Sequence, residues 1–228
     1  MSTKFKLTGL FAITIMIGIL GLVAVMPVVA AETIADGDLV KTADSGKVYV
    51  VSGSTIKHIS DMNVFKSYGY AVSKIKTVVS LADYTAGAAL NKVMDGTLIK
   101  SLTDKAVYVV SNGNRRHIVN IAAFNGLGYK VGLIMQLSSS AMANYTTGDA
   151  ITSAATIPDG ALVKATDSGK VYIIESGKKR PISTMDAFKL NNFQVKNILV
   201  IPSATVATIT AGDAVVAKIT TTPVTPPV

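Results

Sequence analysis

The sequence predicts an α+β protein of three tandem β-β-β-α-β repeats that pack together after an N-terminal apolar signal helix. Three observations support this prediction. An uncharged apolar segment opens the chain, an Asp-Gly pair returns at steps of 59 and 64 residues, and each return begins the same succession of strand and helix patterns. The chain is 49% apolar and 16% charged, which excludes disorder throughout.

Residues 1–31 have the pattern of a secretory signal peptide. Two lysines among the first six residues precede an uncharged apolar stretch, residues 7–31, which ends in a proline and small residues. Signal peptidase cleaves after such small residues, so we expect cleavage after Ala31. The stretch also reaches the ~20 residues that a spanning helix needs, so a retained membrane anchor is the alternative. In both cases we expect an exported protein, secreted or at the cell surface, that touches the membrane only through residues 7–31 if these stay uncleaved.

The same two steps relate further residues of the three copies. The recurring positions are Tyr49, Tyr108 and Tyr172; Ile59, Ile118 and Ile182; and Phe65, Phe124 and Phe188. We therefore place repeat 1 at residues 34–92, repeat 2 at 93–156 and repeat 3 at 157–218, followed by a Thr/Pro-rich tail at 219–228. Because about sixty residues make a marginal domain alone, we expect the repeats to pack together.

Each repeat begins with an Asp-Gly turn, a short apolar strand, a polar turn and a β-branched strand. The second strand is apolar on both faces, so we expect it to be central and covered on both sides. A Gly/Asn/Ser turn then leads into a basic strand, which completes a hairpin. The first two strands are expected at 39–41 and 48–51, at 98–100 and 107–110, and at 162–164 and 171–174.

A helix around the recurring phenylalanine comes next. We expect it to be capped by Ser60, by Asn120, and by Ser183 or Thr184, whose side-chain oxygens accept free backbone N–H groups. Gly69, Gly128 and Asn192 should end it, because Gly and Asn tolerate the left-handed conformation. A last strand, expected at 76–79, 133–135 and 198–201, and a short Ser/Ala-rich turn or helix lead to a closing Thr-x-Gly motif.

Candidate ligand-binding residues lie on the basic strand and at the helix ends. They are Lys57, His58, Arg115, Arg116, His117, Lys178, Lys179 and Arg180, with Tyr70 and Tyr129. Arg and Lys at a strand edge can bind phosphate, sulfate or carboxylate groups, and tyrosines can stack on sugar rings. The alternative interpretation is a solvated hairpin edge, where lysine prevents edge-to-edge aggregation.

We expect no metal, no cofactor and no catalysis. The chain has no Cys and two His, and the third copy has Pro181 where the others have His58 and His117. The repeated acidic residues lack the spacing of a calcium loop. Neither a Ser-His-acid set nor a pair of aligned carboxylates occurs, so the chain is not expected to be an enzyme.

The pattern Asp-Gly-x-Leu-Val-Lys, Val-Tyr-x-Ile, Gly-Lys-Lys-Arg-x-Ile, Phe, Gly-Tyr resembles tandem repeats of exported bacterial surface proteins. Repeat 3 matches it best, at 159–164, 171–172 and 177–180, and departs from it at Asn192-Phe193. A looser resemblance joins Leu127-Gly128 to the LGFP repeats of wall-associated proteins. These resemblances imply an envelope location and a binding or structural role, and they supply no catalytic residue.

These observations favour a structural or adhesive protein, as a surface-layer, filament or wall-associated component. Its expected partners are copies of itself or other envelope proteins. One alternative is a module that binds glycans or anionic wall polymers, which suits the charge of +6 that remains when the two lysines before residue 32 are removed from the +8 of the chain. Another is a scaffold held in the membrane by residues 7–31. A moderate charge spread along an exported chain does not indicate nucleic-acid binding.

Overall fold

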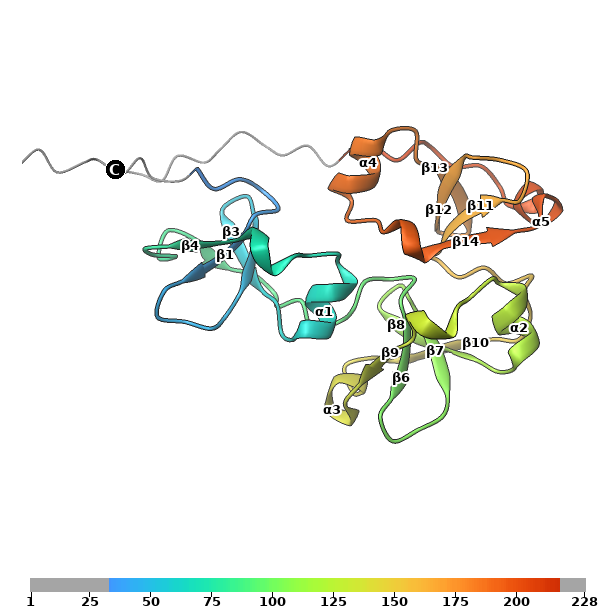
Figure 1. The fold of residues 1–228 in the computed structure, drawn as a ribbon, viewed down its shortest axis with the longest axis horizontal. Coiled ribbons are helices and arrows are strands. Elements are labelled where there is room, and N and C mark those ends of the chain that lie inside the picture. The colour runs from blue at the N-terminus through green and yellow to red at the C-terminus, as the bar shows by residue number, and fades with distance from the viewer. Residues whose placement is uncertain (1–32, 218–228) are drawn as a thin grey trace, which may run out of the picture. The chain divides into compact units, whose positions relative to one another are not determined.

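Three small β-sheets organise residues 33–217, the part of the chain that this computed structural model describes (Figure 1). Short helices join the strands, which confirms the α+β class. The expected signal helix and the Thr/Pro-rich tail at 219–228 lie outside the described residues. Between residues 33 and 217, no helix is long and apolar enough to cross a membrane.

Sheet 1 has the strand order β4-β1-β2-β3-β5. Its first three strands form an antiparallel meander, while β4 pairs in parallel with β1 and β5 with β3. The crossover from β3 to β4 carries a helix and a 3-10 turn. The elements are β1 (Leu39–Thr42), β2 (Tyr49–Ser52), β3 (Thr55–His58), α1 (Met62–Ser67), η1 (Val72–Lys74), β4 (Ile75–Val78) and β5 (Thr85–Ala86).

Sheets 2 and 3 are assembled in the same way, in the orders β10-β8-β7-β6-β9 and β13-β12-β11-β14. Sheet 2 and its helices comprise β6 (Leu98–Ser101), β7 (Val107–Ser111), β8 (Asn114–Ile118), α2 (Ile121–Gly126), η2 (Val131–Leu133), β9 (Met135–Leu137), α3 (Ser139–Met142) and β10 (Thr147–Ile151). Sheet 3 and its helices comprise β11 (Leu162–Ala165), β12 (Val171–Glu175), β13 (Lys178–Pro181), α4 (Met185–Leu190), η3 (Val195–Asn197), β14 (Ile198–Ile201) and α5 (Ser203–Thr208). We refer to each sheet with its helices as unit 1, unit 2 and unit 3.

The helix ends largely follow the sequence expectations. Asn120 and Thr184 cap α2 and α4 as expected. The cap expected of Ser60 is wrong, because the carboxylate of Asp61 accepts the N–H groups of residues 63 and 64 at 2.7 and 3.1 Å. At the other end, the left-handed conformation is confirmed at all three positions, with φ of +70° at Gly69, +73° at Gly128 and +60° at Asn192.

The fourth strand of unit 3, β14, spans 198–201 as expected, whereas those of units 1 and 2 begin at other residues than expected. β4 starts at Ile75, one residue before the expected start, and β9 starts at Met135, two residues after it. In each unit a 3-10 turn precedes this strand, and the N–H of the residue after the turn donates to the carbonyl of its first residue. The 3-10 turn has no apolar periodicity that can be recognised in the sequence. The sequence therefore does not predict at which residue the turn ends and the strand begins.

The Asp-Gly pairs hold the hairpins. The carboxylates of Asp95 and Asp159 accept the N–H groups of Gly113 and Gly177 at 3.0 and 2.9 Å, and Asp36 accepts that of Gly53. In each unit, the Asp that precedes the first strand thus stabilises the turn between the second and third strands. This backbone role accounts for the recurrence of the Asp without a bound cation.

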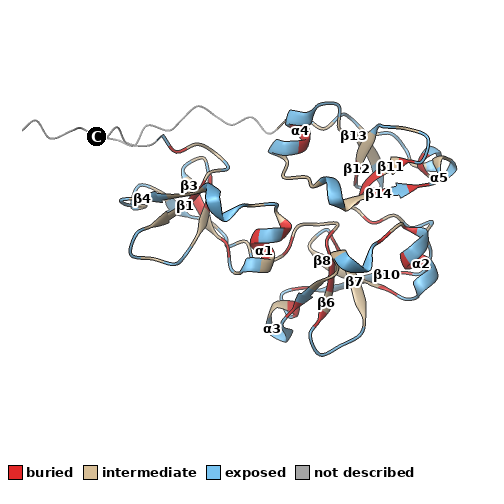
Figure 2. Ribbon diagram, in the orientation of Figure 1, coloured by how far each residue is buried: buried red, intermediate tan, exposed pale blue. Residues whose placement is uncertain are grey.

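Each sheet has two apolar faces, which we call the helix face and the back face. The helix face carries Leu39 or its counterparts Leu98 and Leu162, and packs on the helix of its own unit. The back face carries the adjacent residue, Val40 in unit 1. Buried residues lie mainly along the strands and on one side of each helix (Figure 2).

Two shared cores join the units. In the first, the helix face of sheet 1 meets the back face of sheet 2, with Leu39, Val50, Ile59, Val64 and Phe65 against Val93, Ile99, Val110, Leu137, Met142 and Tyr145. In the second, the helix face of sheet 2 meets the back face of sheet 3, with Leu98, Val109, Ile118, Phe124, Leu127 and Tyr129 against Ala161, Val163, Ile174, Leu199, Ile201 and Val206. Each fully buried large apolar side chain contributes about 1.5–3 kcal/mol. The back face of sheet 1 and the helix face of sheet 3 form separate clusters.

Candidate functional site

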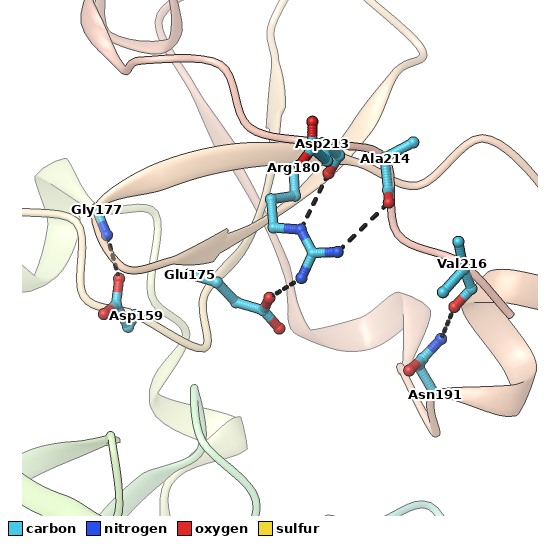
Figure 3. Close-up of polar contacts among 8 residues, drawn as sticks. All are labelled: Asp159, Glu175, Gly177, Arg180, Asn191, Asp213, Ala214 and Val216. Atoms are coloured by element: carbon cyan, nitrogen blue, oxygen red, sulfur yellow. Dashed lines mark hydrogen bonds and ion pairs between the residues drawn. The ribbon is translucent and has the colours of Figure 1, made fainter. Parts of the chain in front are cut away.

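The basic strand lies between the central strand and the closing segment of each unit. Arg116 donates from Nε to the carbonyl of Asp149 at 2.8 Å, and Arg180 makes the equivalent bond to Asp213 at 3.0 Å. Arg180 also reaches the carbonyl of Ala214 and pairs with Glu175 (Figure 3). Both arginines therefore bind the backbone of their own unit.

The closing Thr-x-Gly motif is explained by these same side chains. A Cβ added at Gly212 would lie 2.9 Å from Cγ of Arg180, and one added at Gly148 would lie 3.4 Å from Cγ of Arg116. At Gly87 the neighbour is Cγ of Lys57, at 3.3 Å. Glycine thus leaves room for the aliphatic stem of a basic residue, a relation that the sequence pattern alone did not reveal.

Arg115 and Lys179 precede Arg116 and Arg180 in the sequence. They bind α3 and α5, which we call the cap helices. Arg115 donates to the carbonyl of Met142 at 3.2 Å, and Lys179 donates to that of Val206 at 2.6 Å. Each carbonyl also accepts a backbone N–H, from Tyr145 and Ile209 respectively, and a cation near the C-terminal end of a helix is favoured by the helix dipole. Arg115 also lies over the ring of Tyr108, at 5.5 Å from its centroid. Lys178, at the hairpin end of β13, is exposed.

The two histidines pair with tyrosines across the hairpins. The ring centroids of His58 and Tyr49 lie 5.4 Å apart, as do those of His117 and Tyr108. In unit 3 the residue opposite the tyrosine is Pro181. Among residues 33–217, no group of three or more His, Asp or Glu side chains is placed to hold a metal ion.

The two candidate tyrosines have different surroundings. Tyr129, a candidate for stacking on sugar rings, is only 8% exposed, because the back face of sheet 3 covers the helix face on which it lies. Burial raises the pKa of its hydroxyl, which has no hydrogen-bond partner among the described residues. Tyr70 is half-buried and stacks on Tyr68 at 5.6 Å between centroids, with the rings 14° from parallel. Burial raises the pKa of Tyr70 to about 12.

Tyr70 lines a cleft of about 670 Å³ that also contains the candidate Lys57. We call it the tyrosine cleft. Its charged and aromatic lining residues are Asp36, Asp38, Lys57, Tyr68, Tyr70 and Lys189. Lys189 comes from α4 of unit 3. Units 1 and 3 also meet where the side chain of Gln194 donates to the carbonyl of Ser67 at 2.6 Å. Stacked rings beside carboxylate and ammonium groups suit a polyhydroxylated ligand such as a sugar.

A second cavity, of about 690 Å³, lies on the helix face of sheet 3. We call it the unit 3 groove. Its apolar lining residues include Val171, Ile182, Met185, Phe188, Val195 and Ile198. Sequence reasoning did not single it out, because the same residue types in units 1 and 2 lie in the shared cores.

Comparisons with known proteins leave the chain without an assigned family. No family model and no curated protein matches it. Among solved structures, it is similar to the periplasmic assembly from the ESX-5 inner membrane complex, with 11% identity and a TM-score of 0.23, over 87% of this chain and 73% of that one. It is also similar to an intact ESX-5 inner membrane complex, with 13% identity and a TM-score of 0.22, over 85% of this chain and 55% of that one. TM-scores this low do not indicate a common fold.

Proposed function

We propose that this protein is an exported surface component with a structural or adhesive role, and that it acts by contact rather than by catalysis. The observation that carries the proposal is the repeated interface: the same two faces pack together twice in one chain. Tandem units that present equivalent surfaces turn weak contacts into strong ones through avidity. The signal-like segment at 1–31 and the resemblance to repeats of exported bacterial surface proteins support the location.

The hydrogen bonds that the basic residues make also favour a binding or structural role over a catalytic one. Arg115, Arg116, Lys179 and Arg180 hydrogen-bond to backbone carbonyls of their own units. These bonds build the framework and occupy donors that an anionic substrate would need. Copies of the protein and other envelope proteins are the partners that we propose.

Fractionation of intact cells tests the location and the role. We expect the protein in the envelope or the medium, and protease added to intact cells should degrade the envelope-bound part. Recovery in the cytoplasm would refute the proposal. Mass spectrometry of the native N-terminus separates the two export hypotheses: a start at Glu32 indicates a cleaved signal, and a retained 7–31 segment indicates a membrane-held scaffold.

The tyrosine cleft favours a second candidate function, the binding of wall glycans. Tyr68 and Tyr70 supply a stacking surface, and Lys57 and Lys189 supply donors beside it. In pull-downs with purified wall polysaccharide, Tyr70→Ala should weaken binding severalfold, since an aromatic contact contributes about 0.5–1.5 kcal/mol. Tyr70→Phe keeps the ring and serves as the matched control. Equal binding by Tyr70→Ala and the unaltered protein would exclude this site.

A further inference from the structure

The interface between units can be defined from its two copies inside the chain. In each copy, the last strand and cap helix of one unit lie on the helix face of the unit before it. Leu137 and Met142 make this contact for unit 2, and Ile201 and Val206 make it for unit 3. Asn63 of α1 adds a hydrogen bond to the carbonyl of Gln136 in β9. The contact is therefore directional, because the two faces differ.

On the helix face, the exposed fraction of one recurring isoleucine differs between units that are followed by another unit and the unit that is not. Ile59 and Ile118 are each 6% exposed beneath the following unit. Their counterpart Ile182 is only partly buried and lines the unit 3 groove. The groove thus lies where the next unit packs in the two internal interfaces.

On the back face, sheet 1 shows the complementary difference. Leu137 and Ile201 are each 1% exposed, whereas their counterpart Val78 is partly exposed. Met142 is 5% exposed and lies three residues before Tyr145; Leu81 has the same place before Tyr84 and is partly exposed. The two end faces therefore carry the residues that an adjoining unit would bury.

We propose that copies of this protein associate head to tail, with the helix face of sheet 3 in one copy packing on the back face of sheet 1 in the next. This inference rests on the proposed structural function and names the partner as a second copy of the chain. Its support is continuity with an interface that the chain already makes twice. Because the two faces differ, the contact is heterologous and leads to a chain or a ring of several copies rather than to a dimer with identical contact faces.

One difference between the end face and the internal faces sets the strength of the association. Lys76 Nζ lies 3.0 Å from a carboxylate oxygen of Asp38, and these side chains are 26% and 25% exposed. In unit 3 the corresponding residues are Leu199 and Ala161, both in the shared core. Covering an ion pair removes its hydration, which opposes association. The contact between copies is therefore weaker than the contact between units, and reversible.

Sedimentation velocity on the exported protein, from micromolar to millimolar concentration, tests the inference. The mean mass should rise with concentration beyond that of a dimer. Ile182→Lys should reduce the association at least tenfold. Met185→Lys in the same groove is the matched control: its counterparts Met62 and Ile121 stay 52% and 67% exposed with a neighbour in place, so this change should leave association unaltered. Circular dichroism checks that each variant is folded.

A gain-of-function variant removes any ambiguity from misfolding. Asp38→Ala with Lys76→Leu gives the back face of sheet 1 the residues of unit 3, and it should strengthen association at least tenfold. Protein that stays monomeric in both the unaltered and the double-variant form would overturn the inference. Equal association by Ile182→Lys and the unaltered protein would also overturn it. Retention of a monomeric protein at the cell surface would leave the proposed function standing, so the two failures are distinguishable.

Discussion

Two glycines illustrate how single residues set the spacing between units 2 and 3. The Asp-Gly turns of these units touch, so that a Cβ added at Gly160 would lie 2.7 Å from both the carbonyl carbon of Asp95 and the nitrogen of Gly96. At Gly37, the equivalent residue of unit 1, an added Cβ has no heavy atom of the described residues within 4 Å. Both adopt a positive φ, +88° at Gly160 and +84° at Gly37. The two glycines share a conformation but differ in crowding.

This difference predicts unequal effects of alanine. Gly37→Ala should carry only the backbone strain of a left-handed residue. Gly160→Ala should carry the same strain plus a clash with backbone, which adds about 1–3 kcal/mol. Urea denaturation of the two variants measures the difference directly. Equal losses in the free energy of unfolding would show that units 2 and 3 do not touch through these turns.

The hydroxyl groups of Tyr129 and Tyr145 are both buried, but their removal is expected to change the free energy of unfolding differently. Tyr145 accepts the buried N–H of Val93 at 2.7 Å, so Tyr145→Phe leaves that donor unpaired and should cost about 1–3 kcal/mol. The hydroxyl of Tyr129 has no hydrogen-bond partner within residues 33–217, so Tyr129→Phe should be neutral or stabilising. Midpoints of urea denaturation distinguish the two variants. A larger loss for Tyr129→Phe than for Tyr145→Phe would contradict this assignment.

At the scale of the element, the helix that follows each basic strand was largely predictable from sequence. Asn120 and Thr184 cap their helices, and Gly69, Gly128 and Asn192 end them, because few residue types satisfy those geometries. The choice between two adjacent capping residues depends on backbone direction. That is why Asp61 and not Ser60 caps α1.

The capping assignment for α1 is testable with these two neighbours. Asp61→Ala removes two hydrogen bonds to the first turn and should lower the free energy of unfolding by about 0.5–2 kcal/mol. Ser60→Ala removes a hydroxyl that bonds only the Asp61 side chain in the part of the chain described here, so its effect should be much smaller. Chemical denaturation measures both. A larger loss for Ser60→Ala than for Asp61→Ala would show that Ser60, and not Asp61, caps α1.

The candidate site was predictable only in part. The repeated period located Lys57 and Tyr70, which line the tyrosine cleft, but Lys189 joins them through the packing of units distant in sequence. Tyr129 occupies the position of Tyr70 in the repeat, yet a neighbouring sheet buries it. A local pattern predicts which residues share a face; which face receives a neighbour is decided by tertiary packing.

At the scale of the whole molecule, the buried tyrosines predict how stability responds to high pH. Burial raises the pKa of Tyr70 and Tyr145 from 10.0 to about 12, and it raises that of Tyr129 further. The unfolded chain therefore releases these protons first as the pH rises. The contribution of these tyrosines to the free energy of unfolding is fully present below pH 10 and should fall between pH 10 and pH 12. Thermal unfolding across this range measures the loss, and a constant midpoint would contradict it.

The shared cores make the three units depend on one another. Both apolar faces of unit 2 belong to cores that a neighbouring unit completes, and units 1 and 3 each share one face in this way. Units of about sixty residues are marginal alone, so the cores should couple their unfolding. The proposed surface role and the head-to-tail contact both depend on this coupling, since they rest on the same interface.

The chain contains no tryptophan, so single reporters can be placed at will. Tyr49→Trp in unit 1 and Tyr172→Trp in unit 3 occupy equivalent positions on the central strands β2 and β12. Urea denaturation followed by the fluorescence of each variant tests this coupling most directly. We predict that the two reporters give the same midpoint and the same slope. Separate transitions for unit 1 and unit 3 would show that the units fold independently, and would contradict the account.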